Sequence, residues 1–188
     1  NGPNRALSTG GLRYWKDGRD VPDINICLYD YPETKTHAAF NASLRVNFIA
    51  GSGGGGGFKL IGTEGAMEVS SNSCKLIRPK MGTIPGDYSM IAFTENTQKR
   101  ITKSYNDKNI KKRAVALNTG ESLWEVPADY KGGHYDHFYN FFQAIRGKVE
   151  IIQDPTFGLR AAGAALLANK SYFQKRPVNW NPEAMMLL

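Results

Sequence analysis

The sequence predicts an α+β fold, in which an open, largely antiparallel β-sheet has helices packed on one face. Its first part alternates apolar and polar side chains with a period of two, as half-buried strands do. Its last part, from His134 onward, has the spacing of two amphipathic helices. At 188 residues and 41% hydrophobic, the chain is long enough to bury one core.

The strand pattern is clearest at 40–48, where Phe40, Ala42, Leu44, Val46 and Phe48 alternate with polar residues. An earlier strand is expected at 24–29, with Ile24, Ile26 and Leu28 as its apolar series. The segment 31–34, which contains Pro32, supplies the turn between these two strands.

Further strands are expected at 58–61, 66–70 and 73–78, the first two forming a hairpin around Gly62–Gly65. The glycine-rich run 51–57 lacks the Lys-Ser/Thr of a phosphate-binding loop and precedes a strand. It therefore favours a mobile hairpin loop over a phosphate cradle. Trp124–Pro127 resembles a strand or an extended arm.

The first expected helix spans about 135–146 and ends at Gly147, a residue that takes positive φ at little cost. Its apolar face consists of Phe138, Phe141, Phe142 and Ile145.

The second expected helix runs from about 156 to 173. Asp154 can accept hydrogen bonds from its free amide groups, and Pro155 fits its first turn. The helix carries an apolar stripe and a set of small neighbours that permit close packing. The stripe consists of Leu159, Ala162, Leu166 and Phe173. The prolines of 176–182 then favour a short edge strand. Both helices are expected to cover the apolar face of the sheet.

The net charge of +7 raises the possibility of nucleic-acid binding. However, seven basic residues fall within 98–113 against Asp107 alone, and Tyr105 is the only aromatic residue among them. This pattern favours a solvated helix or loop, and we expect no nucleic-acid partner. We also expect no membrane partner, because no apolar run approaches 18 residues. Cys27 and Cys74 fit buried small hydrophobes better than a disulfide.

The segment 15–23 is the best candidate for groups that face a substrate. Loops on rigid sheets often carry binding groups, and mixed acids and guanidinium groups suit hydroxyl-rich ligands. The alternative is a solvated hairpin whose charges pair with each other. The substrate-facing candidates in this loop are Lys16, Asp17, Arg19 and Asp23.

The polar face of the expected sheet is a second candidate surface, because exposed sheets tend to associate. We expect it to form a subunit interface or a wall that binds a polyol, with plain solvation as the alternative. The residues are Asn41, Ser43, Arg45 and Asn47.

His134 and His137 flank Asp136, but the sequence marks no further ligand, so no metal site is expected.

Four stretches of the chain carry a family resemblance: Gly10–Asp23, Gly62–Val69, His137–Arg146 and Gly158–Asn169. In order and spacing they resemble the C-terminal, substrate and oligomerisation domain of the family of glucose-fructose oxidoreductase, inositol dehydrogenase and MocA. The resemblance is weakest at 80–131, which is interpreted as an insertion in a single domain, 1–188.

The resemblance implies an oxidoreductase that acts on a sugar, polyol or glycoside with NAD or NADP. It also implies a homo-oligomer assembled through the open sheet. His137 matches a position of the family's helix motif and joins the substrate-facing candidates, in a hydrogen-bonding role rather than proton transfer.

The chain departs from the family pattern in three respects. It has no Gly-rich turn between a strand and a helix for a dinucleotide. The family's Glu-Lys-Pro and Asp-x-x-x-His strings, which carry its catalytic lysine and histidine, are also absent.

We therefore expect a fragment without catalytic residues, without bound cofactor and without activity of its own. Its partner would be an N-terminal dinucleotide-binding domain. The start at Asn1, without a targeting segment, fits a fragment and leaves the compartment open between cytoplasm and periplasm. The alternative is a non-catalytic carbohydrate-binding or protein-interaction module on the same fold.

Overall fold

The computed structural model describes residues 2–49, 51, 55–79, 88–115 and 120–188, and side chains there except at 88–89 and 110–115. It has the expected α+β composition, with antiparallel strands throughout. The strands form two sheets instead of one. Contacts divide the chain into two compact units, which are described separately: residues 1–54 with 131–188, and residues 55–130.

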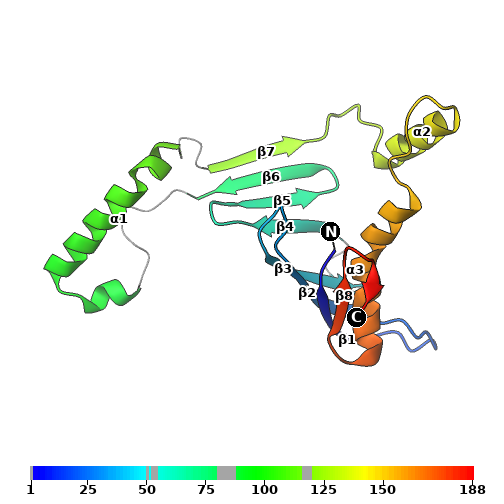
Figure 1. Ribbon diagram of the computed structural model, residues 1–188, viewed down its shortest axis with the longest axis horizontal. Coiled ribbons are helices and arrows are strands. Elements are labelled where there is room, and N and C mark those ends of the chain that lie inside the picture. Colours follow the sequence, from blue (N-terminus) through cyan, green and yellow to red (C-terminus); the bar gives the residue numbers. More distant parts are fainter. Residues whose placement is uncertain (1, 50, 52–54, 80–87, 116–119) are drawn as a thin grey trace. The chain divides into compact units, whose positions relative to one another are not determined.

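The first unit contains a five-stranded sheet of order β3-β2-β1-β8-β9 (Figure 1). Its strands are β1 (Arg5–Gly11), β2 (Ile24–Tyr31), β3 (Phe40–Asn47), β8 (Val178–Asn181) and β9 (Met186–Leu187). The predicted strands at 24–29 and 40–48 and the turn between them are confirmed. The exit strand is confirmed as β8, although the two-residue β9 lies outside it at the edge.

The inward face of β2 differs from the prediction. Cys27 and Tyr29 are buried, whereas Ile26 and Leu28 are exposed on the opposite face. The register explains the difference, because Cys27 pairs with Leu44 and Tyr29 with Ala42, and cross-strand partners share a face. In β3 the apolar residues share the face of Cys27 and Tyr29 as expected, but the prediction that they are buried is wrong for Phe40 and Leu44, which are 45% and 43% exposed.

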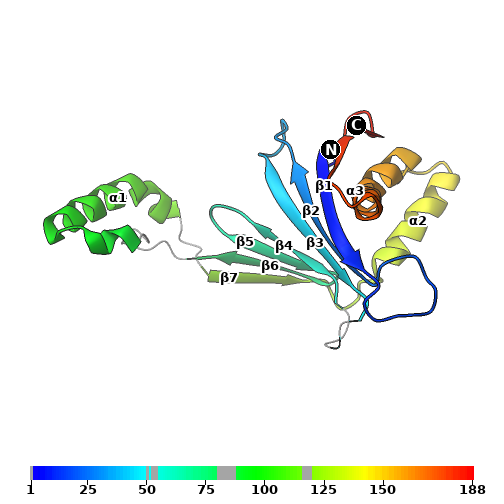
Figure 2. The same ribbon diagram turned by 90° about the horizontal axis from the view of Figure 1, so that it is seen from below.

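Helix α3 (Pro155–Gln174) covers the inward face of the sheet by packing against β1 and β8 (Figure 2). Its start is as predicted: Asp154 accepts the backbone N–H of Phe157 at 2.7 Å, and Pro155 occupies the first turn. The core consists of Ala6, Cys27, Tyr29, Leu167, Ala168 and Val178. Four partly buried residues pack against it: Tyr31, Ala42, Ala164 and Trp180.

The buried side of α3 is not the predicted stripe. Leu159, Leu166 and Phe173 are exposed, and Ala162 is exposed with them. Leu167 and several small residues face the sheet instead, and the Tyr29 hydroxyl donates to the Ala164 carbonyl at 3.0 Å. The buried residues of α3 are Gly163, Leu167, Ala168 and Ser171.

Helix α2 (Gly133–Ile145) matches the first predicted helix, and Gly147 follows it with φ +68°. No residue of α2, which the structure describes in full, is buried. Phe138, Phe142 and the rest of the expected apolar face are therefore exposed. Of the two helices expected to cover the sheet, α3 alone does so among the residues described.

The second unit contains a sheet of order β4-β5-β6-β7, with strands β4 (Gly57–Ile61), β5 (Ala66–Ser70), β6 (Ser73–Arg78) and β7 (Gly120–Glu125). The predicted hairpin is confirmed, and the Gly62 N–H donates to Gly65 O at 2.8 Å across its turn. One face carries the ion pairs Lys59–Glu68 and Lys75–Glu121. The other is almost entirely apolar: Phe58, Leu60, Met67, Val69, Cys74, Leu76 and Trp124.

A 3-10 turn (Tyr88–Ala92) and helix α1 (Glu95–Val115) complete the second unit. The basic segment 98–113 lies on α1, in agreement with the helical alternative. The run 51–57 falls partly outside the described residues, although Gly57 begins β4. In the described part of the chain, no helix has the length and apolar character needed to cross a bilayer.

Both cysteines are free thiols. Cys27 is fully buried in the first unit, whereas Cys74 in the second is only partly buried. Burial raises the pKa of the Cys27 thiol. The prediction of a buried small hydrophobe is therefore confirmed for Cys27. It is wrong for Cys74, which is only partly buried.

Candidate functional site

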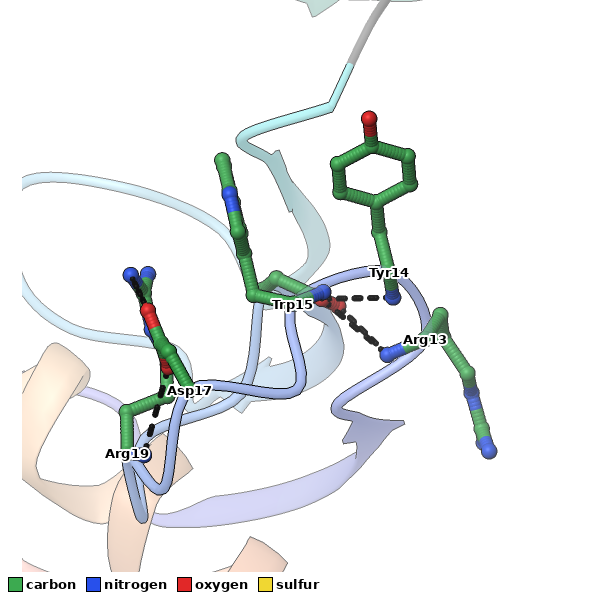
Figure 3. Close-up of polar contacts among 6 residues, drawn as sticks. Arg13, Tyr14, Trp15, Asp17 and Arg19 are labelled. Atoms are coloured by element: carbon green, nitrogen blue, oxygen red, sulfur yellow. Dashed lines mark hydrogen bonds and ion pairs between the residues drawn. The ribbon is translucent and has the colours of Figure 1, made fainter.

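The connection between β1 and β2, residues 12–23, is organised around the carboxylate of Asp23. This side chain, 1% exposed, accepts the backbone N–H groups of Arg13 at 2.9 Å, Tyr14 at 2.8 Å and Trp15 at 3.2 Å (Figure 3). Three successive N–H groups around one anion form a nest. The backbone of the loop is thereby fixed to the first residue before β2.

The Asp23 carboxylate is an anchor, and not the substrate-facing group that the sequence predicted. Burial would raise the pKa of its carboxyl, but the N–H donors of Arg13, Tyr14 and Trp15 together outweigh burial and lower the pKa. Asp23 is also tied to the residue that follows β3, because its carbonyl accepts the Phe48 N–H at 3.0 Å. The carboxylate thus stays ionised and is taken up by the protein's own backbone.

Asp17 and Arg19 form an ion pair at the tip of the loop. The Arg19 Nε donates to Asp17 Oδ1 at 2.8 Å and to Oδ2 at 3.1 Å. The bond from Arg19 lowers the pKa of Asp17, and the same bond raises the pKa of Arg19. The charges of the loop do pair with each other, as the alternative interpretation proposed. Both side chains nevertheless stay open to solvent and keep donors and acceptors for a ligand.

Two aromatic residues of this loop were not named as substrate-facing candidates, although Trp15 begins the predicted segment 15–23. The Tyr14 and Trp15 rings meet edge to face, with centroids 5.7 Å apart and planes at 86°. The Arg19 guanidinium carbon lies 4.6 Å from the centroid of the Trp15 ring, within the range of a cation–π contact. Adjacent aromatic residues in an otherwise charged loop are the signal that could have identified them.

The remaining substrate-facing candidates lie apart from this cluster of contacts. Lys16 is exposed, and its Nζ reaches Leu12 O at 3.5 Å. His137 lies on α2 with its ring edge against Phe138, at a centroid distance of 5.8 Å.

The open face of the five-stranded sheet contains the predicted polar residues Asn41, Ser43, Arg45 and Asn47. Asn41 donates to Asp30, which also pairs with Arg5 at 2.6 Å. Asn47 accepts the Ile49 N–H at 3.0 Å and so closes the end of β3.

Apolar side chains occupy the middle of this open face. Leu7 pairs with Leu28, and Ile26 pairs with Arg45 across the neighbouring strand. Leu7, Ile26 and Leu28 are 45%, 43% and 54% exposed. The face therefore has an apolar centre with polar groups beside it, which the sequence pattern did not predict.

The described residues contain no group of three or more histidine, cysteine or acidic side chains that could hold a metal. The backbone nest of the 12–23 loop, which could otherwise take the pyrophosphate of a dinucleotide, is filled by Asp23.

Comparison with known proteins identifies a shared fold. A candidate oxidoreductase from Thermotoga maritima superimposes with a TM-score of 0.54 at 16% sequence identity, over 94% of this chain and 40% of its own. This likeness shows the fold alone. The chain thus spans about 40% of the length of the protein that it resembles.

Two further structures match with lower TM-scores. A candidate NADPH-dependent oxidoreductase from Desulfitobacterium hafniense gives 0.44 at 15% identity, over 95% of this chain and 42% of its own. A candidate oxidoreductase from Bacillus subtilis gives 0.48 at 12% identity, over 96% of this chain and 46% of its own. No model of a protein family matches the chain. No curated protein matches it either.

Proposed function

We propose that this chain is the substrate-side and oligomerisation domain of an NAD(P)-dependent oxidoreductase that acts on a sugar, polyol or glycoside. The observation that carries the proposal is the fold shared with the T. maritima protein over 94% of this chain but only 40% of that one. The four sequence stretches that resemble the sugar and inositol oxidoreductases support the same assignment. The remaining length of the relative leaves room for a second domain.

The cofactor would be held by that second domain. A nicotinamide dinucleotide supplies hydride transfer, and its pyrophosphate needs free backbone N–H groups or a helix N-terminus after a Gly-rich turn. The backbone nest of the 12–23 loop does not offer free N–H groups, because Asp23 accepts from them. The contribution of this chain is to bind and orient the substrate, for which the exposed Lys16, Asp17 and Arg19 provide charged donors and acceptors on a rigid loop.

The open face of the five-stranded sheet is the proposed contact with a second copy. Its centre of Leu7, Ile26 and Leu28 with polar residues alongside has the anatomy of an interface, an apolar core with a polar rim. A two-fold arrangement would place the same face of both subunits together.

The upstream coding sequence tests the assignment. We expect the reading frame before Asn1 to encode a strand, a Gly-rich turn and a helix, followed by an Asp-x-x-x-His string. The extended polypeptide should bind NAD(H) or NADP(H) in a fluorescence titration, and the 188-residue chain should not. A frame that encodes this module alone, or sugar oxidation by the 188-residue chain itself, would overturn the proposal.

A non-catalytic carbohydrate-binding module is the second candidate. The Asp17–Arg19 ion pair favours it, because these charges serve binding without acid or base chemistry. An extended polypeptide that binds sugars but neither cofactor would select this alternative.

A further inference from the structure

The aromatic pair Tyr14–Trp15 in the 12–23 loop has no part in the core. Tyr14 is 67% exposed, and its ring stands edge-on to Trp15. An aromatic ring exposed to water costs free energy, so the exposed Tyr14 beside the partly buried Trp15, on a binding loop, indicates a ligand with an apolar surface.

This aromatic pair is fixed in place before any ligand arrives. The backbone N–H groups of both residues are bound by the buried Asp23 carboxylate. The Arg19 guanidinium lies over the Trp15 ring and is held there by Asp17, and Figure 3 shows Arg13 pointing away from this group. Preorganisation of this kind reduces the entropy lost on binding.

The net charge of the loop and the filled backbone nest indicate which class of ligand the loop can bind. The loop is neutral overall, because its three basic side chains are balanced by three acidic ones: Arg13, Lys16 and Arg19 against Asp17, Asp20 and Asp23. The backbone nest that could take a phosphate or carboxylate is already filled by Asp23. A neutral ligand is therefore favoured over an anion.

A pyranose ring fits both requirements. Its axial C–H groups form an apolar face that can lie on an aromatic ring, and its rim of hydroxyls can accept from a guanidinium and donate to a carboxylate. We propose that the exposed Tyr14 ring forms a stacking platform for a pyranose ring, that the perpendicular Trp15 ring borders this platform, and that Arg19 and Asp17 bind the sugar hydroxyls. The proposal rests on the proposed function and deepens it by assigning the sugar to this aromatic pair.

Nuclear magnetic resonance of the 188-residue chain can test the platform directly. The chain has three tryptophans, so the indole N–H signals of Trp15, Trp124 and Trp180 can be assigned from single Trp→Phe variants. We expect methyl β-glucopyranoside to shift the Trp15 signal and to leave Trp124 unchanged. Sorbitol, which has hydroxyls but no ring face, should produce a much smaller shift.

The variant Tyr14→Ala should weaken pyranoside binding by roughly tenfold, the size of effect typical of an aromatic contact residue. Phe173→Ala, which removes an aromatic ring exposed on α3, is the matched control and should not change the affinity. Circular dichroism and thermal unfolding should match wild type for both variants. If pyranosides bind without shifting Trp15, bind equally well to Tyr14→Ala, or do not bind at all, the platform proposal is overturned.

The extended polypeptide separates this proposal from the proposed function. If it transfers hydride and Tyr14→Ala leaves the KM for sugar unchanged, the platform is wrong and the domain assignment stands. If it has no oxidoreductase activity but the Trp15 response to pyranosides is lost in Tyr14→Ala, the assignment fails and the platform stands. A change in sedimentation on Tyr14→Ala, without loss of pyranoside binding, would identify the pair as a protein contact and refute the platform.

Discussion

The Ser171 hydroxyl accepts the backbone N–H of Ser8 at 2.9 Å, which joins α3 to β1 across 163 positions of the chain. The same hydroxyl donates to Arg176 O at 2.7 Å. β8 pairs with β1 only at Arg5 and Ala6. At Ser8, beyond the end of this pairing, the backbone N–H of β1 donates to a side chain of α3 instead. One buried serine thus connects the helix, the sheet and the turn that leads to β8.

Replacement of this serine should destabilise the first unit. Ser171→Ala leaves a buried N–H and a carbonyl without their partner, and we expect the free energy of unfolding to fall by about 1–3 kcal/mol. Urea unfolding followed by circular dichroism measures the change. Ser104→Ala, at an exposed position of α1, is the control and should stay within about 0.5 kcal/mol of wild type. Equal effects of the two variants would contradict the connecting role.

The Asp23 anchor should appear in the acid stability of the chain. Its pKa is lower in the folded state than the ordinary value of 3.8, so its stabilising contribution is present above that value. It should be lost as the pH falls below 3.8 and through the lower folded-state pKa. In Asp23→Asn, the fall in stability with decreasing pH over this range should be shallower, and the protein should be less stable at neutral pH. Thermal unfolding from pH 2 to pH 7, with the exposed Asp20→Asn as control, tests this. If the stability of Asp23→Asn fell as steeply with decreasing pH as that of wild type, the anchoring role of Asp23 would be contradicted.

The hydroxyl of Tyr29 should stabilise the contact between β2 and α3. Tyr29→Phe removes the hydrogen bond to Ala164 O, and we expect a loss of about 0.5–1.5 kcal/mol in urea unfolding. Tyr14→Phe, at an exposed ring, should show a smaller change.

Tyr29 should also contribute to alkaline unfolding. Burial raises its pKa above the ordinary value of 10.0, so the folded state binds a proton that the unfolded state releases. The associated stability is complete below pH 10 and decreases as the pH rises beyond it. Tyr29→Phe should therefore lose less stability than wild type between pH 9 and pH 12. Absorbance at the tyrosinate band, recorded with circular dichroism, would refute this if Tyr29 ionised before unfolding.

The end of α3 offers a stabilising substitution. Lys175 has left-handed backbone angles, φ 55° and ψ 35°, which glycine adopts without the steric cost of a Cβ. We expect Lys175→Gly to raise the free energy of unfolding by about 0.5–1 kcal/mol. Lys170→Gly, inside the same helix, should lower it by about 1 kcal/mol. If both variants lost similar amounts of unfolding free energy, Lys175 at the end of α3 would not be strained.

Self-association through the open sheet face can be tested at its centre. Leu28→Arg places a charge among Leu7, Ile26 and Leu28, and we expect the dissociation constant of the oligomer to rise by at least roughly tenfold. Sedimentation equilibrium measures it, with Ala39→Arg, in the connection before β3, as the control. A wild-type chain that remains monomeric at high concentration would refute the interface.

The sequence predicted the positions of most strands and of both C-terminal helices, because local signals such as Asp154-Pro155 and the alternation of 40–48 act within a few residues. It did not predict which faces are buried. Ile26 and Leu28 are more hydrophobic than Cys27 and Tyr29, yet the register with β3 turns them outward. Cross-strand pairing connects distant segments and cannot be read from the pattern of one strand.

The candidate site was also predicted from the sequence only in part. The charged tip at Asp17 and Arg19 was found from its composition, and their mutual pairing was one of the two alternatives considered. The anchoring role of Asp23 required the folded loop, since nothing local indicates that three preceding N–H groups converge on it. The contact between the Tyr14 and Trp15 rings, and the Arg19 guanidinium over Trp15, likewise depend on the folded loop and have no local sequence signal.

Each compact unit contains one free cysteine. Thiol labelling can therefore detect local opening of the first unit without an added probe. Cys27 becomes reactive toward a maleimide only when β2 separates from α3, whereas Cys74 is accessible without such a separation. The slow phase of thiol labelling therefore counts openings of the first unit alone. A ligand or a second domain that tightens this unit would be detected as slower labelling of Cys27, even where the ligand changes no spectroscopic signal.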